Sequence, residues 1–121
     1  MPYIKSNDGR RQALQKGSLA LTAGELNYEM FYYIKHQAPP YDSERVYYVL
    51  KSMVVQFLGE NPNYQKYNDM TGALIRCAFE IERRMPEKKE ATDILLKIML
   101  SYNDEINKYE DLKIQENTDV E

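Results

Sequence analysis

Two tyrosines four residues apart, Tyr28 and Tyr32, have the spacing of residues that could form a binding surface. Side chains at positions i and i+4 share one face of a helix, and Lys35 lies beside this pair. Aromatic rings next to cations can stack with nucleobases while the cations contact phosphates. We therefore hypothesise an aromatic wall on which a base or a partner side chain stacks.

Other tyrosines and several arginines could complete this wall. The additional tyrosines are Tyr41, Tyr47 and Tyr48, and the assisting cations are Arg10, Arg11 and Arg45. The alternative is that the tyrosines pack at a helix–helix or subunit interface with their hydroxyl groups at its rim. The sequence leaves both interpretations open.

A second cationic group lies near the end of a predicted helix, at Arg83 and Arg84. Paired guanidinium groups can bind a phosphate or a carboxylate through several N–H donors. The neighbouring carboxylates Glu80 and Glu82 could form an acid–base dyad. We favour the alternative of a solvated charged face, in which Arg76 and Glu80, four residues apart, form an ordinary surface ion pair.

Catalytic motifs are absent from the sequence. The chain has one histidine and one cysteine, His36 and Cys77, and neither belongs to a recognisable nucleophile–base set. No HExxH, CxxC, P-loop or GxGxxG pattern occurs. We predict a protein that is not an enzyme and has neither a metal nor a cofactor. His36 is expected to play a structural role near a helix end, and Cys77 to fill a semi-buried position.

Helix-start and helix-stop signals define the elements that must position these side chains. Residues 22–25 have the capping-box pattern, which predicts a helix from about Ala23. Asp42 or Ser43 is expected to cap the next helix, and Gly59 is placed to end it.

Two further helices follow a predicted turn at 61–63. Apolar periodicity predicts the first of them up to about Met85, with Gly72 and Ala73 allowing a close neighbour. Pro86 suits the first turn of a last helix, because its missing N–H has no partner there.

These signals predict an all-α fold, a small helical bundle of about four main helices plus a short N-terminal helix over 10–16. A chain of 121 residues is sufficient for one core. We expect residues 1–109 to form a single helical domain and 110–121 to form an acidic C-terminal tail. Broad apolar stripes could also be shared between subunits, which favours a homo-oligomer.

Composition excludes two classes of partner. The net charge of −3 argues against a protein that coats extended nucleic acid, because neutralising phosphates needs a clustered excess of Lys and Arg. No apolar stretch is long enough to cross a bilayer, and none resembles a signal peptide. We predict a cytoplasmic protein that does not bind membranes.

Four stretches of the chain are similar to a family of short phage and prophage proteins with a domain of unknown function. They read MPYI (1–4), GELNY (24–28), YNDMTGALIRCAFEIERR (67–84) and YEDLKIQENTDVE (109–121). The resemblance implies a phage setting and supplies no established activity.

The chain departs from the family pattern at several places. It carries extra helical sequence around 41–60 and 87–106, and it has Thr118 and Glu121 where the pattern has Gly and Tyr. The last two differences put a shared role of the tail in doubt.

Three functions follow as hypotheses. The first is a counter-defence protein that acts in the host cytoplasm by sequestering a small nucleotide immune signal. The second is an anti-CRISPR-like inhibitor of a host defence protein complex, whose acidic tail mimics nucleic-acid charge. The third is a structural or assembly factor.

Overall fold

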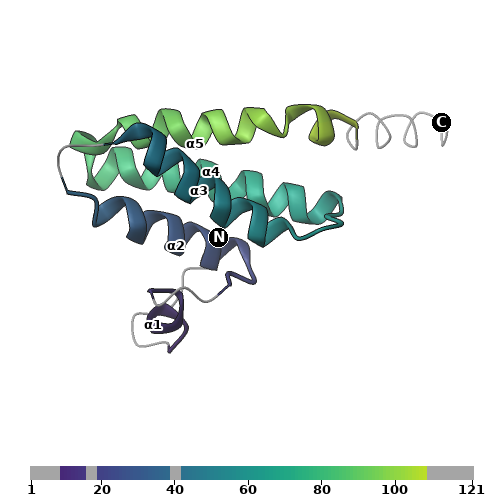
Figure 1. Cartoon of the computed structure of the whole chain (residues 1–121), viewed down its shortest axis with the longest axis horizontal. Helices are drawn as coiled ribbons and strands as arrows, with labels where there is room; N and C mark the ends of the chain where they lie inside the picture. The colour runs from purple at the N-terminus through teal and green to yellow at the C-terminus, as the bar shows by residue number, and fades with distance from the viewer. Residues whose placement is uncertain (1–8, 16–18, 39–41, 109–121) are drawn as a thin grey trace.

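The computed structural model describes residues 9–15, 19–38 and 42–108 and confirms the predicted all-α bundle. These residues contain no strand. The predicted tail at 110–121 and Tyr41 lie outside them. The helices, shown in Figure 1, are α1 (Gly9–Gln15), α2 (Ala23–Lys35), α3 (Ser43–Leu58), α4 (Tyr64–Arg84), the 3₁₀ turn η1 (Pro86–Lys88) and α5 (Glu90–Ser101).

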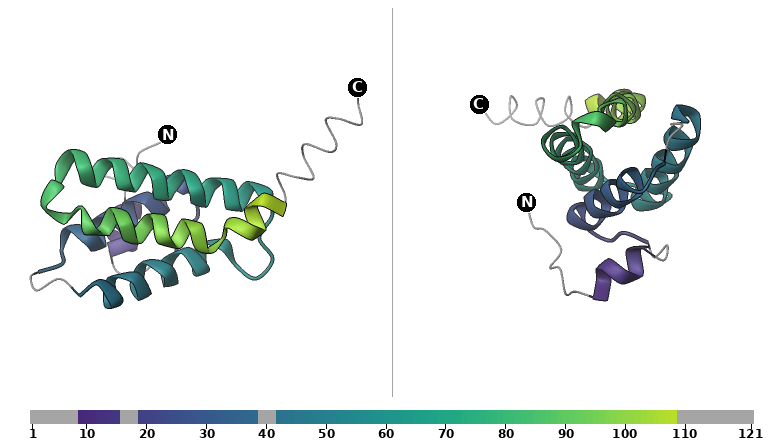
Figure 2. Two further views of the ribbon diagram at one scale, coloured as in Figure 1. Left: turned by 90° about the horizontal axis from the view of Figure 1, so that it is seen from above. Right: turned by 90° about the vertical axis from the view of Figure 1, so that its left-hand side faces the viewer.

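The four long helices pack in a ring around one core. α2 packs on α4, α4 on α5, α5 on α3, and α3 back on α2. The short helix α1 packs on α2 and lies beside the bundle, as the end-on view in Figure 2 shows. Helix α2 therefore contacts three other helices, α1, α3 and α4.

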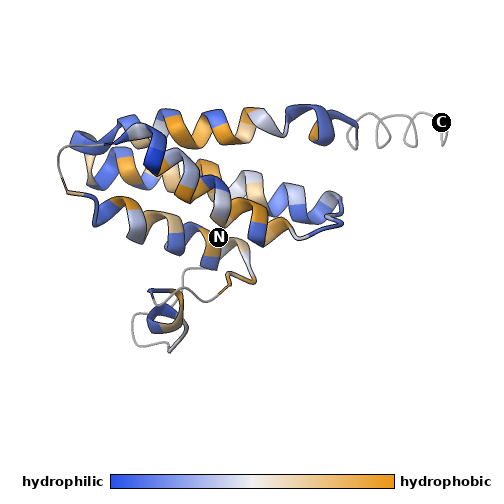
Figure 3. Ribbon diagram, in the orientation of Figure 1, coloured by the Kyte–Doolittle hydropathy of each residue, from blue (hydrophilic) through white to orange (hydrophobic). Residues whose placement is uncertain are grey.

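The core consists of the apolar positions that recur along each long helix, seen as orange bands in Figure 3. Each fully buried Leu, Ile, Val or Met side chain contributes about 1.5–3 kcal/mol to folding. The largest fully buried side chains are Leu26, Met30 and Ile34 on α2, Val46, Leu50 and Val54 on α3, Met70, Leu74, Cys77 and Ile81 on α4, and Leu95 and Ile98 on α5.

The helix caps that the sequence predicts are present in the structure. Thr22 Oγ1 accepts a hydrogen bond from Glu25 N–H at 3.1 Å, and the Glu25 carboxylate accepts one from Leu21 N–H at 2.8 Å. Asp42 rather than Ser43 caps α3. Its Oδ1 atom accepts a hydrogen bond from the backbone N–H of Arg45, three residues later, at 3.2 Å. Gly59 ends α3 at φ +76°, in the left-handed region that favours glycine.

Three details differ from the sequence-based expectations. Gly72 is exposed, and outside its own stretch of helix no atom lies within 4 Å of the position a Cβ would take, so no neighbour packs closely on it; Ala73 is the buried residue of the pair. Pro86 opens η1 rather than α5. The last helix breaks at Tyr102, whose N–H bonds to Met99 O, and residues 103–108 are helical again.

A lysine from η1 caps the C-terminal end of α2. Lys88 Nζ donates hydrogen bonds to the carbonyl oxygens of Ile34 at 2.9 Å, Lys35 at 2.7 Å and Gln37 at 3.0 Å. The last carbonyls of a helix have no partner within the helix, and a cation also suits its negative end. This one ammonium group therefore fastens the α4–α5 corner to the end of α2.

We predict that Lys88→Met destabilises the protein by about 1–3 kcal/mol, because three carbonyls lose a charged donor. The measurement is the free energy of unfolding from urea titration. The control is Lys89→Met, a change at the adjacent exposed lysine, which should shift the value by less than about 0.5 kcal/mol. Equal losses in the two variants would contradict the capping role.

Glu29 is a half-buried carboxyl on α2. Burial raises its pKa from 4.5 to about 7, and the nearby Glu25 carboxylate adds to this shift. Between these two pH values the folded protein holds a proton that the unfolded chain releases, so stability falls as pH rises through this window. Above about pH 7 Glu29 is ionised in both states, and the free energy of unfolding falls no further on its account.

Glu29→Gln should therefore raise the melting temperature more at pH 8 than at pH 5, because glutamine resembles the protonated side chain. Thermal unfolding followed by circular dichroism at both pH values measures this difference. Glu82→Gln, at an exposed glutamate on α4, serves as the control and should give no such pH-dependent gain. A gain of the same size at both pH values for Glu29→Gln would rule out the ionisation as its cause.

Candidate ligand-binding site

A pocket of about 520 Å³ opens between α1, α2 and the C-terminal end of α4. Its volume lies in the range of roughly 300–1,000 Å³ that is usual for small-molecule sites. Arg11 and Gln15 come from α1, and Glu80, Arg83 and Arg84 come from α4. The remaining wall is formed by α2 and its C-terminal cap residue.

The α2 wall is a row of three neighbouring aromatic rings, of which the first two are stacked and the last two are tilted against each other. The ring centroids of Tyr28 and Tyr32 are 6.0 Å apart with planes inclined by 26°, and those of Tyr32 and His36 are 4.4 Å apart at 50°. The three residues are spaced by four, so they follow one face of the helix. We call Tyr28, Tyr32 and His36 the aromatic row.

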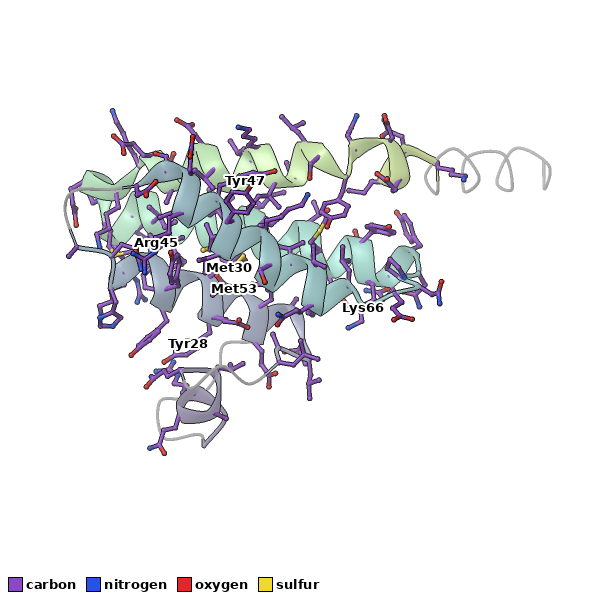
Figure 4. The ribbon with its side chains drawn as sticks, viewed as in Figure 1. Tyr28, Met30, Arg45, Tyr47, Met53 and Lys66 are labelled. Atoms are coloured by element: carbon purple, nitrogen blue, oxygen red, sulfur yellow. The ribbon has the colours of Figure 1, made fainter. Side chains whose placement is uncertain are left out.

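Residues of α1 hold one end of the aromatic row. Gln15 Nε2 donates a hydrogen bond to the Tyr28 hydroxyl at 2.6 Å, and the guanidinium carbon of Arg11 lies 5.1 Å from the centre of the Tyr28 ring. The second distance fits a cation–π contact. Figure 4 shows Tyr28 extending from α2 toward α1. Tyr28 is thus fixed by two side chains from a different helix.

A buried carboxylate orients the two arginines of α4. One oxygen of Glu80, Oε2, lies 2.8 Å from Arg83 Nη2 and 3.0 Å from Arg84 Nε. Glu80 is only 7% exposed, whereas the arginine side chains are 63% and 57% exposed. The expectation of a solvated charged face is therefore wrong for Glu80. Each guanidinium has further N–H donors beyond these contacts.

The pocket is positively charged although the chain as a whole carries a net charge of −3. Among the residues that the structure describes, its lining contains Arg11, Lys35, Arg83 and Arg84 against the single carboxylate of Glu80. A concave surface with one sign of charge concentrates ligands of the opposite sign. This pocket therefore favours an anion, and its aromatic row favours one with a planar ring.

Asn27 is the buried polar residue of the α2 wall. It lines the pocket and is 5% exposed. Its Oδ1 atom is buried and has no hydrogen-bond partner among the residues that the structure describes. A buried acceptor without a donor costs about 1–3 kcal/mol. A ligand that supplies a donor would remove this cost.

Five of the predicted site residues lie at the pocket, namely Arg11, Tyr28, Tyr32, Arg83 and Arg84. Arg45 does not line this pocket: it lies on α3, where its charge acts on Tyr33, and Figure 4 shows it away from Tyr28. Arg10 belongs to α1, but its side chain lies outside the described part of the structure.

The proposed extension of the wall by tyrosines of α3 is also wrong. Tyr47 faces Lys97 of α5, whose Nζ lies 5.2 Å from its ring centre, and Tyr48 is 74% exposed to solvent. Neither residue lines the pocket. The reason is that α3 packs on α2 and α5, whereas the pocket lies where α2 meets α1 and α4.

Cys77 does not line this pocket. Cys77 is fully buried rather than semi-buried, and burial raises the pKa of its thiol. Within the described residues, no group of three or more His, Cys, Asp or Glu side chains could hold a metal ion. In the same part of the chain, no helix has the length and apolar character needed to cross a membrane.

Comparisons of this chain with models of protein families, with curated proteins and with solved structures gave no match. The similarity to the phage family therefore stays a prediction.

Proposed function

We propose that this protein acts by binding a small anion with a planar ring, of the nucleotide class, in the pocket between α1, α2 and α4. The observation that carries the proposal is the combination of the aromatic row with the Arg83–Arg84 pair in one pocket. The ring of the ligand stacks on aromatic side chains, and its phosphates accept hydrogen bonds from the guanidinium groups.

The sequence stretches with family resemblance supply much of this pocket. The stretch 24–28 contains Asn27 and Tyr28, and the stretch 67–84 contains Glu80 and both arginines. The extra sequence around 41–60 and 87–106 corresponds mainly to α3, η1 and α5, which contribute no lining residue. This distribution supports the pocket as the feature that this chain shares with the family it resembles.

In the phage setting that the resemblance implies, binding without turnover means sequestration. A nucleotide immune signal held in this pocket would not reach its receptor in the host cell. The function we propose is therefore counter-defence by sequestration of a nucleotide signal.

A second candidate function is inhibition of a host protein complex. It is favoured by exposed apolar side chains on two helices that pack together, Ile75 and Phe79 on α4 and Leu96 and Leu100 on α5. Exposed apolar side chains of this kind often belong to protein interfaces. We likewise propose, without a named interface, that the protein forms a homo-oligomer.

The test is calorimetric titration of the purified protein with a panel of mononucleotides, nucleoside diphosphates and cyclic dinucleotides. We expect Arg83→Gln and Tyr32→Leu to weaken the binding of the best ligand at least about tenfold, because each removes a direct contact worth more than about 1.4 kcal/mol. The same ligand should raise the melting temperature of the wild-type protein, since it binds only the folded state.

The matched controls are Arg45→Gln and Tyr48→Leu, which change an arginine and a tyrosine of α3 outside the pocket. Both should bind as the wild type does. Equal weakening in pocket and control variants would place the ligand elsewhere. Failure of every nucleotide in the panel to bind would overturn the proposed function and favour a protein partner.

A further inference from the structure

We infer that the pocket selects a nucleotide whose base carries an exocyclic amino group beside a ring nitrogen, as adenine does, and that Asn27 recognises this edge. The selectivity rests on the proposed function, because it concerns the same pocket. It goes further by naming the chemical group that the protein distinguishes and the side chain that does so.

The unpartnered acceptor of Asn27 defines the kind of group that it can recognise. Its Oδ1 atom is buried without a hydrogen-bond donor in the described part of the chain. Ionised phosphate and carboxylate groups have no N–H or O–H to donate. The anionic part of the ligand therefore cannot satisfy Asn27, whereas an amino group on the ring can.

The positions along α2 separate the recognition of the base from that of the phosphate. Lys88 fastens the end of α2 to η1, and η1 follows directly after the arginine pair at the end of α4. The arginines therefore lie toward the C-terminal end of α2. Asn27 precedes Lys35 by eight residues, or about 12 Å along the helix axis. The aromatic row runs between these two ends, as an extended nucleotide requires.

The carboxamide of Asn27 matches an amino group next to a ring nitrogen. Its oxygen accepts a hydrogen bond from the amino group, and its NH₂ group donates one to the ring nitrogen, which is the pairing by which asparagine recognises adenine. The χ2 torsion of asparagine is broad, so rotation about it can present this pair of atoms to the pocket. A base without an N–H donor leaves Oδ1 unsatisfied in either orientation.

The experiment compares two ligands that differ only in the amino group, adenosine 5′-monophosphate and purine riboside 5′-monophosphate. Both carry the same phosphate and a similar purine ring. We expect the wild-type protein to bind the adenine nucleotide about tenfold more tightly, the discrimination typical of one good pair of hydrogen bonds. Calorimetric titration measures both affinities.

The variant Asn27→Leu keeps the side-chain size and removes the polar atoms, so it should bind the two nucleotides equally well. Asn68→Leu changes an exposed asparagine of α4 outside the pocket. This variant should keep the wild-type ratio of the affinities for the two nucleotides. The wild-type ratio alone tests the inference if Asn27→Leu does not fold.

Three outcomes would overturn the inference, and they differ in what they say of the proposed function. Equal affinities in the wild type would mean that the pocket binds nucleotides without reading the amino group. A ratio preserved in Asn27→Leu would mean that another residue reads it. Failure of both nucleotides to bind would overturn the inference, whereas the proposed function falls only if every nucleotide in the panel fails to bind.

Discussion

The contact on which the geometry of the pocket depends is the ammonium group of Lys88 at the end of α2. Its three hydrogen bonds join the carbonyl end of α2 to the turn that follows α4. This junction holds the C-terminal end of α2 beside the end of α4, where the arginine pair lies. Burial of apolar side chains supplies most of the folding free energy but has no direction. The Lys88 contact is directional, because each of its hydrogen bonds requires a particular carbonyl oxygen at a particular place.

Within that frame, Glu80 prepares the arginine pair for an anion. Two exposed guanidinium groups repel each other, and their long side chains lose rotamer entropy when a ligand orders them. A buried carboxylate between them reduces both costs in advance, since one oxygen contacts both arginines. The pocket keeps an excess of positive charge because Arg11 and Lys35 also line it. An acidic protein can thereby present one cationic site without attracting polyanions over its whole surface.

The sequence predicted what depends on neighbours along the chain. The caps at Thr22 and Asp42 and the stop at Gly59 were correct because these signals are local to each helix end. Tyr28 and Tyr32 were correctly placed together because a spacing of four residues defines a helix face. The function that this face serves is not settled by the spacing.

The sequence failed where the packing of distant segments decides the outcome. Arg45 was expected beside Tyr28 but does not line the pocket, because nothing local indicates that α3 contacts α2 on a different side from α1. Asn27 was missed and Glu80 was misjudged because their burial arises only when α2 packs on α4. The role of Lys88 depends likewise on residues more than fifty positions earlier.

Helix α1 and the pocket share the ring of Tyr28, which Gln15 and Arg11 of α1 contact and which also lines the pocket. Binding free energies are reciprocal, so the factor by which a ligand changes the docking of α1 equals the factor by which docked α1 changes the affinity for the ligand. A ligand that contacts Tyr28 would therefore hold α1 more tightly against α2, and a change in α1 would be felt as a change in affinity.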